Sequence, residues 1–351
     1  MKFMERDITI DVAKGIGILL VVLGHTYYNS QIIYSFHMPL FFILSGASMV
    51  FSTHKYSWKR RIRFIMIPYF CFSLLSFIYW LLIESHFRPI NNTSLFVDRL
   101  LGTFDIRLQQ FMNIFIAENT INSFAYNIVL WFLPCLFVAD YIYSRIKFTP
   151  PPAKWTIIIC IPIVYGIFTD IPCVPFCSNV AIIAVPFLAL GHQFYIPLKY
   201  SIKRSIGKNI TIFLILLAVF IFAYRYFHPS INMLGNKVFP LYLFYGFAII
   251  GSILVLSASS ILEKSRYLSM LFCWIGRNSL VIMCIHEPLK RVLLFILSKA
   301  SGLPIDIIRD DLFLCILTTL IIVAFCIPFI NLINQYTPWI LGRWQSKNTN
   351  L

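Results

Sequence analysis

The feature that most constrains this chain is a series of long apolar runs, of which residues 10–25 and 210–227 are clear examples. An α-helix needs about 20 apolar residues to cross the hydrocarbon core of a bilayer, and it satisfies its backbone hydrogen bonds internally. Hydrophobic residues make up 59% of the 351 residues and charged residues only 12%, a balance too apolar for a soluble fold of this length. The sequence therefore predicts an all-α integral membrane protein.

About ten runs have the length of a membrane-spanning helix. They fall near residues 10–27, 32–52, 64–83, 126–144, 155–170, 179–196, 209–227, 238–259, 278–299 and 311–335. No internal repeat and no low-complexity linker divides them. We therefore expect residues 1–351 to form a single polytopic membrane domain of about ten transmembrane helices, with no appended soluble domain.

Basic residues are distributed unevenly among the predicted loops. If the N-terminus is cytoplasmic, most Lys and Arg residues fall in inner loops, for example at 55–63 and 199–208, whereas residues 84–125 lie outside. This is the positive-inside pattern of membrane proteins. It accounts for the formal net charge of +15, so we do not expect nucleic acid as a partner. The pattern predicts a multi-pass protein with both termini in the cytoplasm.

Three ionisable residues, Asp11, Lys14 and His25, interrupt the first apolar run. One helix would carry Lys14 and His25 on the same stripe, about 16 Å apart along its axis, with Asp11 on the same side. Ionisable residues are costly inside a membrane, and they mark functional sites. For Asp11 and Lys14, pairing at the membrane interface is an equal alternative. His25 lies too deep for that explanation, and we predict that it is functional.

A basic cluster at residues 55–63 precedes the third predicted span. A topology signal is enough to explain its charge. However, Arg60 and Arg63 have the spacing of residues on one helix face, and two guanidinium groups suit the bidentate binding of phosphate. We therefore expect this cluster to bind a phosphorylated ligand from the cytoplasm.

Further polar candidates are His37 and Ser45 in the second predicted span and His286 in the ninth. Only a short turn separates the first two spans, so His37 is expected near His25 at the outer side of the membrane. For His37 and His286, a helix–helix hydrogen bond is the alternative to a catalytic role.

The nine Cys residues contain no C-x-x-C pair, and we predict no metal site. Cys173 and Cys177 fall in a predicted outer loop, where the compartment permits disulfides. Only three residues separate them, so the closed loop would be short and a bridge would stabilise the fold little. A disulfide and two free thiols both stay open.

The polar residues resemble, as a set, the acyltransferase-3 family of integral membrane acyltransferases, and most closely its fucose 4-O-acetylase-like group. The specific motifs are Ile10-Asp11-x-x-Lys14-Gly15 followed by Gly24-His25, and Phe36-His37-Met38-Pro39 followed by Ser45-Gly46. The family's Arg-x-x-Arg pattern is matched by Arg60 and Arg63. Lys14 stands where the family has Arg, which keeps the charge but loses the fork geometry. Weaker similarity near residues 131–133 and 276–286 extends the resemblance over nearly the whole chain.

This resemblance implies an O-acyltransferase, most simply an O-acetyltransferase, of the bacterial inner membrane. Acetyl-CoA would be the cosubstrate, with no bound cofactor. The acceptor would be a sugar hydroxyl of a cell-surface glycan (O-antigen, capsule or exopolysaccharide) or of its lipid-linked precursor. His25 would act as catalytic base or acyl carrier, together with Lys14 and Asp11. The acyl-CoA donor would be bound by Arg60, Arg63 and Lys14.

A membrane transporter or exporter of a glycan or a small organic acid is the main alternative. Buried ions and helices interrupted by Gly or Pro also mark transport paths. Many transporters contain repeats, and this sequence has none. The oligomeric state is left open by the sequence.

Overall fold

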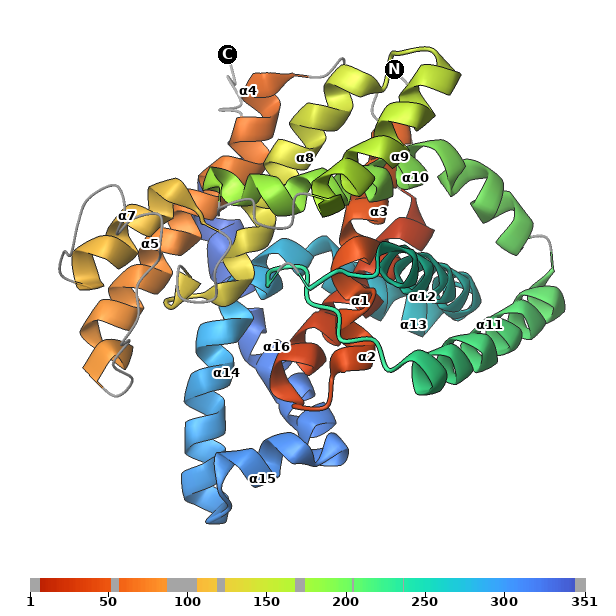
Figure 1. Cartoon of the computed structure of the whole chain (residues 1–351). Helices are drawn as coiled ribbons and strands as arrows, with labels where there is room; N and C mark the ends of the chain where they lie inside the picture. The colour runs from red at the N-terminus through yellow and green to blue at the C-terminus, as the bar shows by residue number, and fades with distance from the viewer. Residues whose placement is uncertain are drawn as a thin grey trace, which may run out of the picture.

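The computed structural model describes residues 7–51, 57–86, 106–118, 124–167, 174–203, 205–235 and 237–344. These ranges are helical almost throughout and contain no β-strand, only an isolated β-bridge between Asn232 and Lys237. The helices cross one another at varied angles instead of forming one parallel bundle (Figure 1). The prediction of an all-α protein is confirmed.

Within the described ranges, eight helical stretches are long and apolar enough to cross a membrane. Their bounds are Ile8–Thr26, Gln31–Val50, Trp58–Leu82, Ile128–Ile146, Pro175–Ile202, Ile206–Phe227, Leu241–Leu262 and Leu312–Tyr336. A polytopic membrane protein is therefore confirmed, but the expected number of ten spans is not. Helices α9 (Pro151–Ile167) and α14 (Ser279–Ser301) occupy the two other predicted ranges. Helix α9 has only 17 residues, and α14 carries charged side chains in its middle.

Two of the predicted spans are interrupted. The second consists of α2 (Gln31–Tyr34) and α3 (His37–Val50), with a break at residues 35–36. The third begins as α4 (Trp58–Arg61), passes through the π-helical segment η1 (Ile62–Met66) and continues as α5 (Ile67–Leu82). A π-helical turn changes the spacing of side chains, so residues on either side of its start no longer follow the α-helical pattern.

Helix α1 (Ile8–Thr26) forms the centre of the protein (Figure 1). It contacts α3, α14, α12 (Leu241–Leu262), α13 (Arg266–Arg277) and α16 (Leu312–Tyr336). Its two ends therefore face different sets of helices. The remaining elements are η2 (Glu84–His86), α7 (Ile106–Ile116), η4 (Ile128–Trp131), α8 (Phe132–Ile146), η5 (Pro175–Cys177), α10 (Ser178–Lys203), α11 (Ile206–Phe227), α15 (Ile305–Asp310) and η6 (Pro338–Leu341).

Glycines permit two close helix crossings. A Cβ atom at Gly276 of α13 would overlap the Asp11 carbonyl oxygen of α1, and one at Gly15 would overlap the Phe272 carbonyl oxygen. At the crossing of α3 and α10, a Cβ atom at Gly191 would overlap the carbonyl oxygen of α3 that it faces. Small residues let helix backbones approach closely in membranes, where packing drives association.

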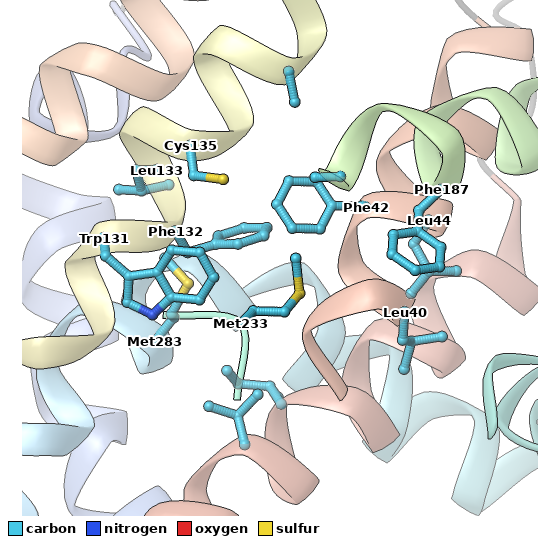
Figure 2. Packing of buried hydrophobic residues seen from close by; sticks show 14 of the residues in the cluster. Leu40, Phe42, Leu44, Trp131, Phe132, Leu133, Cys135, Phe187, Met233 and Met283 are labelled. Carbon is cyan, nitrogen blue, oxygen red and sulfur yellow. The ribbon is translucent and has the colours of Figure 1, made fainter. Parts of the chain in front are cut away.

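Aromatic side chains fill the space between α3, α8 and α10. Phe42 and Phe132 pack edge to face with ring centroids 5.0 Å apart, and Phe187 is completely buried (Figure 2). Trp131 and Met283 lie next to this group in the same view. Edge-to-face pairs of this kind contribute to core packing beyond the area that they bury. They fix α8 against α3, and so they fix the walls of the cavity described below.

We predict that Gly191→Ala destabilises the protein by about 1–3 kcal/mol, because the methyl group must displace the backbone of α3. Gly246→Ala is the matched control: Gly246 lies in α12 and nothing lies within 4 Å of an added Cβ atom. Thermal unfolding of the purified variants in detergent measures the difference. Equal melting temperatures for the two variants would contradict the close crossing.

Candidate functional site

A cavity of about 780 Å³ lies between α1, α3, α4, α8, α10 and α14. Its charged lining residues are all basic: Lys14, Arg60, Arg61 and Lys147. Hydroxyl groups and an imidazole complete the polar part of the wall, contributed by Ser45, Ser48, Ser57, Ser279 and His192. The other part is apolar and includes Phe41, Phe132, Leu133 and Met283. The cavity therefore combines a cationic region with an apolar region, within the usual volume range of a ligand site.

Two of the four cations are linked to a buried carboxylate. Arg61 Nε lies 2.7 Å from Asp140 Oδ2, and the Asp140 side chain is only 1% exposed. Burial lowers the pKa of the Lys147 ammonium, and the negative charge of Asp140 opposes that shift. Because Asp140 holds Arg61 in one position, the guanidinium group is oriented before any ligand arrives. Ion pairs that are this buried are costly to break on one side.

Lys14 and His192, two further polar residues of the cavity, each lie next to a hydroxyl group. Lys14 Nζ lies 3.4 Å from Ser48 Oγ of α3. The Tyr143 hydroxyl group and His192 Nδ1 are 2.8 Å apart and connect α8 to α10. The structure thus brings together three residues that the sequence predicted separately, namely Lys14, Ser45 and Arg60.

Arg63 and Asp11 lie elsewhere. Arg63 donates a hydrogen bond from Nε to the carbonyl oxygen of Gly342, and its guanidinium carbon lies 5.6 Å from the ring centroid of Trp344. Arg63 does not line the cavity, but it stays close to Arg60: the two guanidinium carbons lie 5.5 and 5.8 Å from the ring centroid of Phe64, which does line it. Asp11 accepts a hydrogen bond from Arg277 Nε of α13 at 3.0 Å. This hydrogen bond connects α1 to α13.

Three histidines gather at the opposite end of α1. The ring centroids of His25 and His286 are 5.5 Å apart. Tyr34 lies between His25 and His37, with its ring centroid 5.9 Å from the first and 5.1 Å from the second. The expected proximity of His37 to His25 is confirmed, and it arises because the break between α2 and α3 turns His37 back toward α1.

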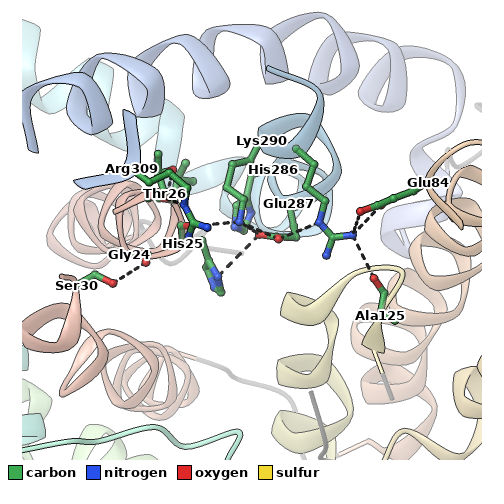
Figure 3. Close-up of polar contacts among 12 residues, drawn as sticks. Gly24, His25, Thr26, Ser30, Glu84, Ala125, His286, Glu287, Lys290 and Arg309 are labelled. Carbon is green, nitrogen blue, oxygen red and sulfur yellow. Dashed lines mark hydrogen bonds and ion pairs between the residues drawn. The ribbon is translucent and has the colours of Figure 1, made fainter. Parts of the chain in front are cut away.

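An ion cluster adjoins these histidines (Figure 3). Glu287 accepts hydrogen bonds from Lys290 at 2.7 and 2.8 Å and from Arg291 at 3.2 Å, and its Oε2 lies 3.9 Å from His25 Nδ1. Arg291 also donates to both carboxylate oxygens of Glu84 at 2.7 Å and to the Ala125 carbonyl oxygen at 3.2 Å. The cluster therefore ties α14 to the end of α5 and to the segment before η4.

The backbone at the end of α1 is also held by cations. Lys290 Nζ donates to the His25 carbonyl oxygen at 3.1 Å, and Arg309 of α15 donates to the carbonyl oxygens of His25 and Thr26 at 3.2 and 3.0 Å (Figure 3). These are carbonyl groups that a helix leaves without partners at its C-terminus, and cations there also favour the helix dipole. The position of His25 is thus fixed by α14 and α15 together.

Sequence reasoning found part of this arrangement. It included Arg61 only as a member of the basic cluster at residues 55–63. It missed Lys147 and His192 at the cavity, and Glu84, Lys290 and Arg291 in the ion cluster. The last two carried a usable signal, because they follow Glu287 by three and four residues inside a predicted span, where unpaired charges are costly. Of the two loop cysteines for which a disulfide and free thiols were both left open, Cys173 lies outside the described residues. Cys177 is buried and donates to the Ala117 carbonyl oxygen at 3.2 Å. No group of three or more His, Cys, Asp or Glu residues suited to a metal ion occurs in the described part of the chain.

Comparison with known proteins gives two matches. Residues 7–340 match the family described as an acyltransferase domain, called acyltransferase-3. A segment of 56 residues is 49% identical to the nodulation protein NolL of Sinorhizobium fredii, covering 12% of this chain and 15% of that protein. The chain therefore aligns with less than one sixth of that relative. No solved structure matches the chain.

Proposed function

This chain belongs to the acyltransferase-3 family, and on that premise we propose that it is a membrane-bound O-acetyltransferase. The donor is cytoplasmic acetyl-CoA, and the acceptor is a sugar hydroxyl of a cell-surface glycan or of its lipid-linked precursor. The enzyme works in the bacterial inner membrane with both termini in the cytoplasm. It needs no bound cofactor and no metal ion, because the thioester is already an activated acyl group.

The observation that carries this proposal is the composition of the cavity. Coenzyme A is a polyanion with a long and largely apolar pantetheine arm. Among the residues that the structure describes, the cavity lining contains four cations and no acidic residue, and its other part is apolar. Arg61 is oriented by Asp140, and guanidinium groups bind phosphate in a bidentate manner. We assign the phosphate groups to Arg60, Arg61, Lys14 and Lys147, and the arm to the apolar part near Phe132.

His25 is the proposed catalytic residue. Its side chain is 16% exposed and its Nδ1 faces the Glu287 carboxylate at 3.9 Å. A carboxylate on this side favours the tautomer with the proton on Nδ1, which leaves the Nε2 lone pair for chemistry. That lone pair serves either as general base toward the sugar hydroxyl or as nucleophile toward the thioester.

We expect Arg60→Ala to raise KM for acetyl-CoA by about tenfold with a smaller fall in kcat, because a charge-assisted bond to phosphate is lost. Arg63→Ala is the comparison variant. Its guanidinium group already donates to the Gly342 carbonyl oxygen, so KM for acetyl-CoA should rise less. Kinetics of radiolabelled acetyl transfer in membranes with matched amounts of correctly oriented protein measure both.

An unchanged KM for Arg60→Ala with reduced kcat would argue against phosphate binding at this position. A larger KM effect for Arg63→Ala than for Arg60→Ala would return the donor site to the pair expected from the sequence.

We expect His25→Ala and His25→Gln to reduce acetyl transfer by about 10²–10⁴-fold, because neither side chain can accept a proton or carry an acyl group in this pH range. Lys14→Arg should keep much of the activity, since the charge remains, and Lys14→Ala should not. Each variant is compared at equal protein level in membranes. Acetyl-CoA binding is the folding control for the His25 variants, and correct membrane orientation is the control for the Lys14 variants, because Lys14 is assigned to the donor site. A His25→Ala variant within severalfold of wild type would remove His25 from the mechanism.

A further inference from the structure

The His286 imidazole is completely buried, and one of its nitrogens has no hydrogen-bond partner. Nδ1 lies 3.0 Å from the carbonyl oxygen of Ile282, one turn earlier in α14. A carbonyl oxygen can only accept, so Nδ1 must carry the proton and Nε2 must carry the lone pair. Nε2 is the unpartnered atom. A buried acceptor without a donor is expensive, so its retention calls for an explanation.

The position of His286 beside His25 supplies that explanation. The ring centroids of the two histidines are 5.5 Å apart, and Glu287, the residue after His286 in α14, faces His25 Nδ1. One turn of α14 therefore carries two groups that face His25. Glu287 orients the His25 ring, and His286 places a second imidazole with a defined lone pair beside that ring. One imidazole cannot hold an acetyl group on Nε2 and accept a proton there at the same time, but two adjacent imidazoles can divide these tasks.

We propose that His25 carries the acetyl group and that His286 Nε2 accepts the proton of the attacking sugar hydroxyl. This inference rests on the proposed function and specifies the chemistry of its outer site. His286 is therefore a catalytic residue, and its bond to the Ile282 carbonyl oxygen sets the tautomer that the reaction requires.

The transfer then takes two steps. His25 Nε2 attacks the thioester carbonyl carbon, the C–S bond breaks, and coenzyme A leaves as a thiolate. The acetylimidazolium keeps its Nδ1 proton toward Glu287. The sugar oxygen then attacks the acetyl carbon while its proton moves to His286 Nε2, and the C–N bond breaks with its electron pair returning to His25 Nε2. His286 finally releases the proton to solvent on the outer side, and the thiolate of coenzyme A takes up a proton from solvent on the cytoplasmic side.

The test uses His286→Asn in the purified full chain. The Asn amide can still donate to the Ile282 carbonyl oxygen, but it lacks the Nε2 lone pair. With radiolabelled acetyl-CoA and no acceptor, wild type and His286→Asn should both form a labelled acetyl-protein, and His25→Ala should not. After addition of O-deacetylated surface polysaccharide from the producing bacterium, we expect label to leave His286→Asn at least ~100-fold more slowly than wild type. Neutral hydroxylamine, which needs no base, should discharge both proteins equally.

Four results would overturn the proposal. Two concern the carrier: a wild-type protein that transfers acetyl without ever becoming labelled, or a label that persists in His25→Ala. Two concern the base: a His286→Asn variant that discharges its label to polysaccharide at the wild-type rate, or labelled acetyl-protein that accumulates in His37→Asn instead. The His37 comparison is matched, because His37 Nδ1 makes the same bond to a carbonyl oxygen one turn earlier, at 2.8 Å from Ile33. His286→Gln provides a second variant if His286→Asn aggregates. Failure of the wild type to acetylate anything would instead refute the proposed function.

Discussion

The arrangement of the helices around His25 depends on the Glu287 carboxylate and the charges around it. A carboxylate in a buried site is costly unless it is paired and hydrogen-bonded. Glu287 is satisfied by Lys290 and Arg291 from its own helix, and Arg291 in turn is held by Glu84 at the end of α5. Each partner constrains the next, so α14, α5 and the end of α1 have one relative arrangement. His25 takes its position from that arrangement.

The centre of the protein is a single helix with a different task at each end. Near its start, α1 supplies Lys14 to a cationic cavity, and at its end it supplies His25 to a cluster of histidines. Phe41, Phe132 and Met283 line the cavity, and Met283 precedes His286 by three residues, less than one helical turn. A pantetheine arm that enters from the cationic side would follow this apolar wall toward the histidines. Under the proposed function the acyl group would have to pass along α1 from this cavity to the histidines, since His25 and His286 are not among the described residues that line it.

Much of this arrangement was predictable from the sequence, for identifiable reasons. The apolar runs fixed the helical class, since a membrane leaves the backbone few alternatives. Ionisable residues inside these runs identified Lys14, His25 and His286, because their cost demands a purpose. The short connection after the first span was enough to predict His37 near His25.

The remaining features depend on contacts between distant segments. Asp140 follows Arg61 by 79 residues, and Glu84 precedes Arg291 by 207, so no local pattern links either pair. The expected ninth span corresponds to α14, which has the length of a span but carries an ion cluster that only tertiary contacts can satisfy. The bond from Arg63 to the Gly342 carbonyl oxygen joins residues 279 apart in the sequence, so no local pattern predicts it either. The roles of Arg61 and Glu84 became visible only in three dimensions.

The central claim is that acetyl passes from a donor on the cytoplasmic face to an acceptor on the outer face. Proteoliposomes of uniform orientation test it most directly, with radiolabelled acetyl-CoA supplied only to the cytoplasmic face and polysaccharide enclosed on the other. We predict that label enters the polysaccharide while coenzyme A stays on the side to which it was added. Label that appears only when donor and acceptor share one compartment would contradict the claim.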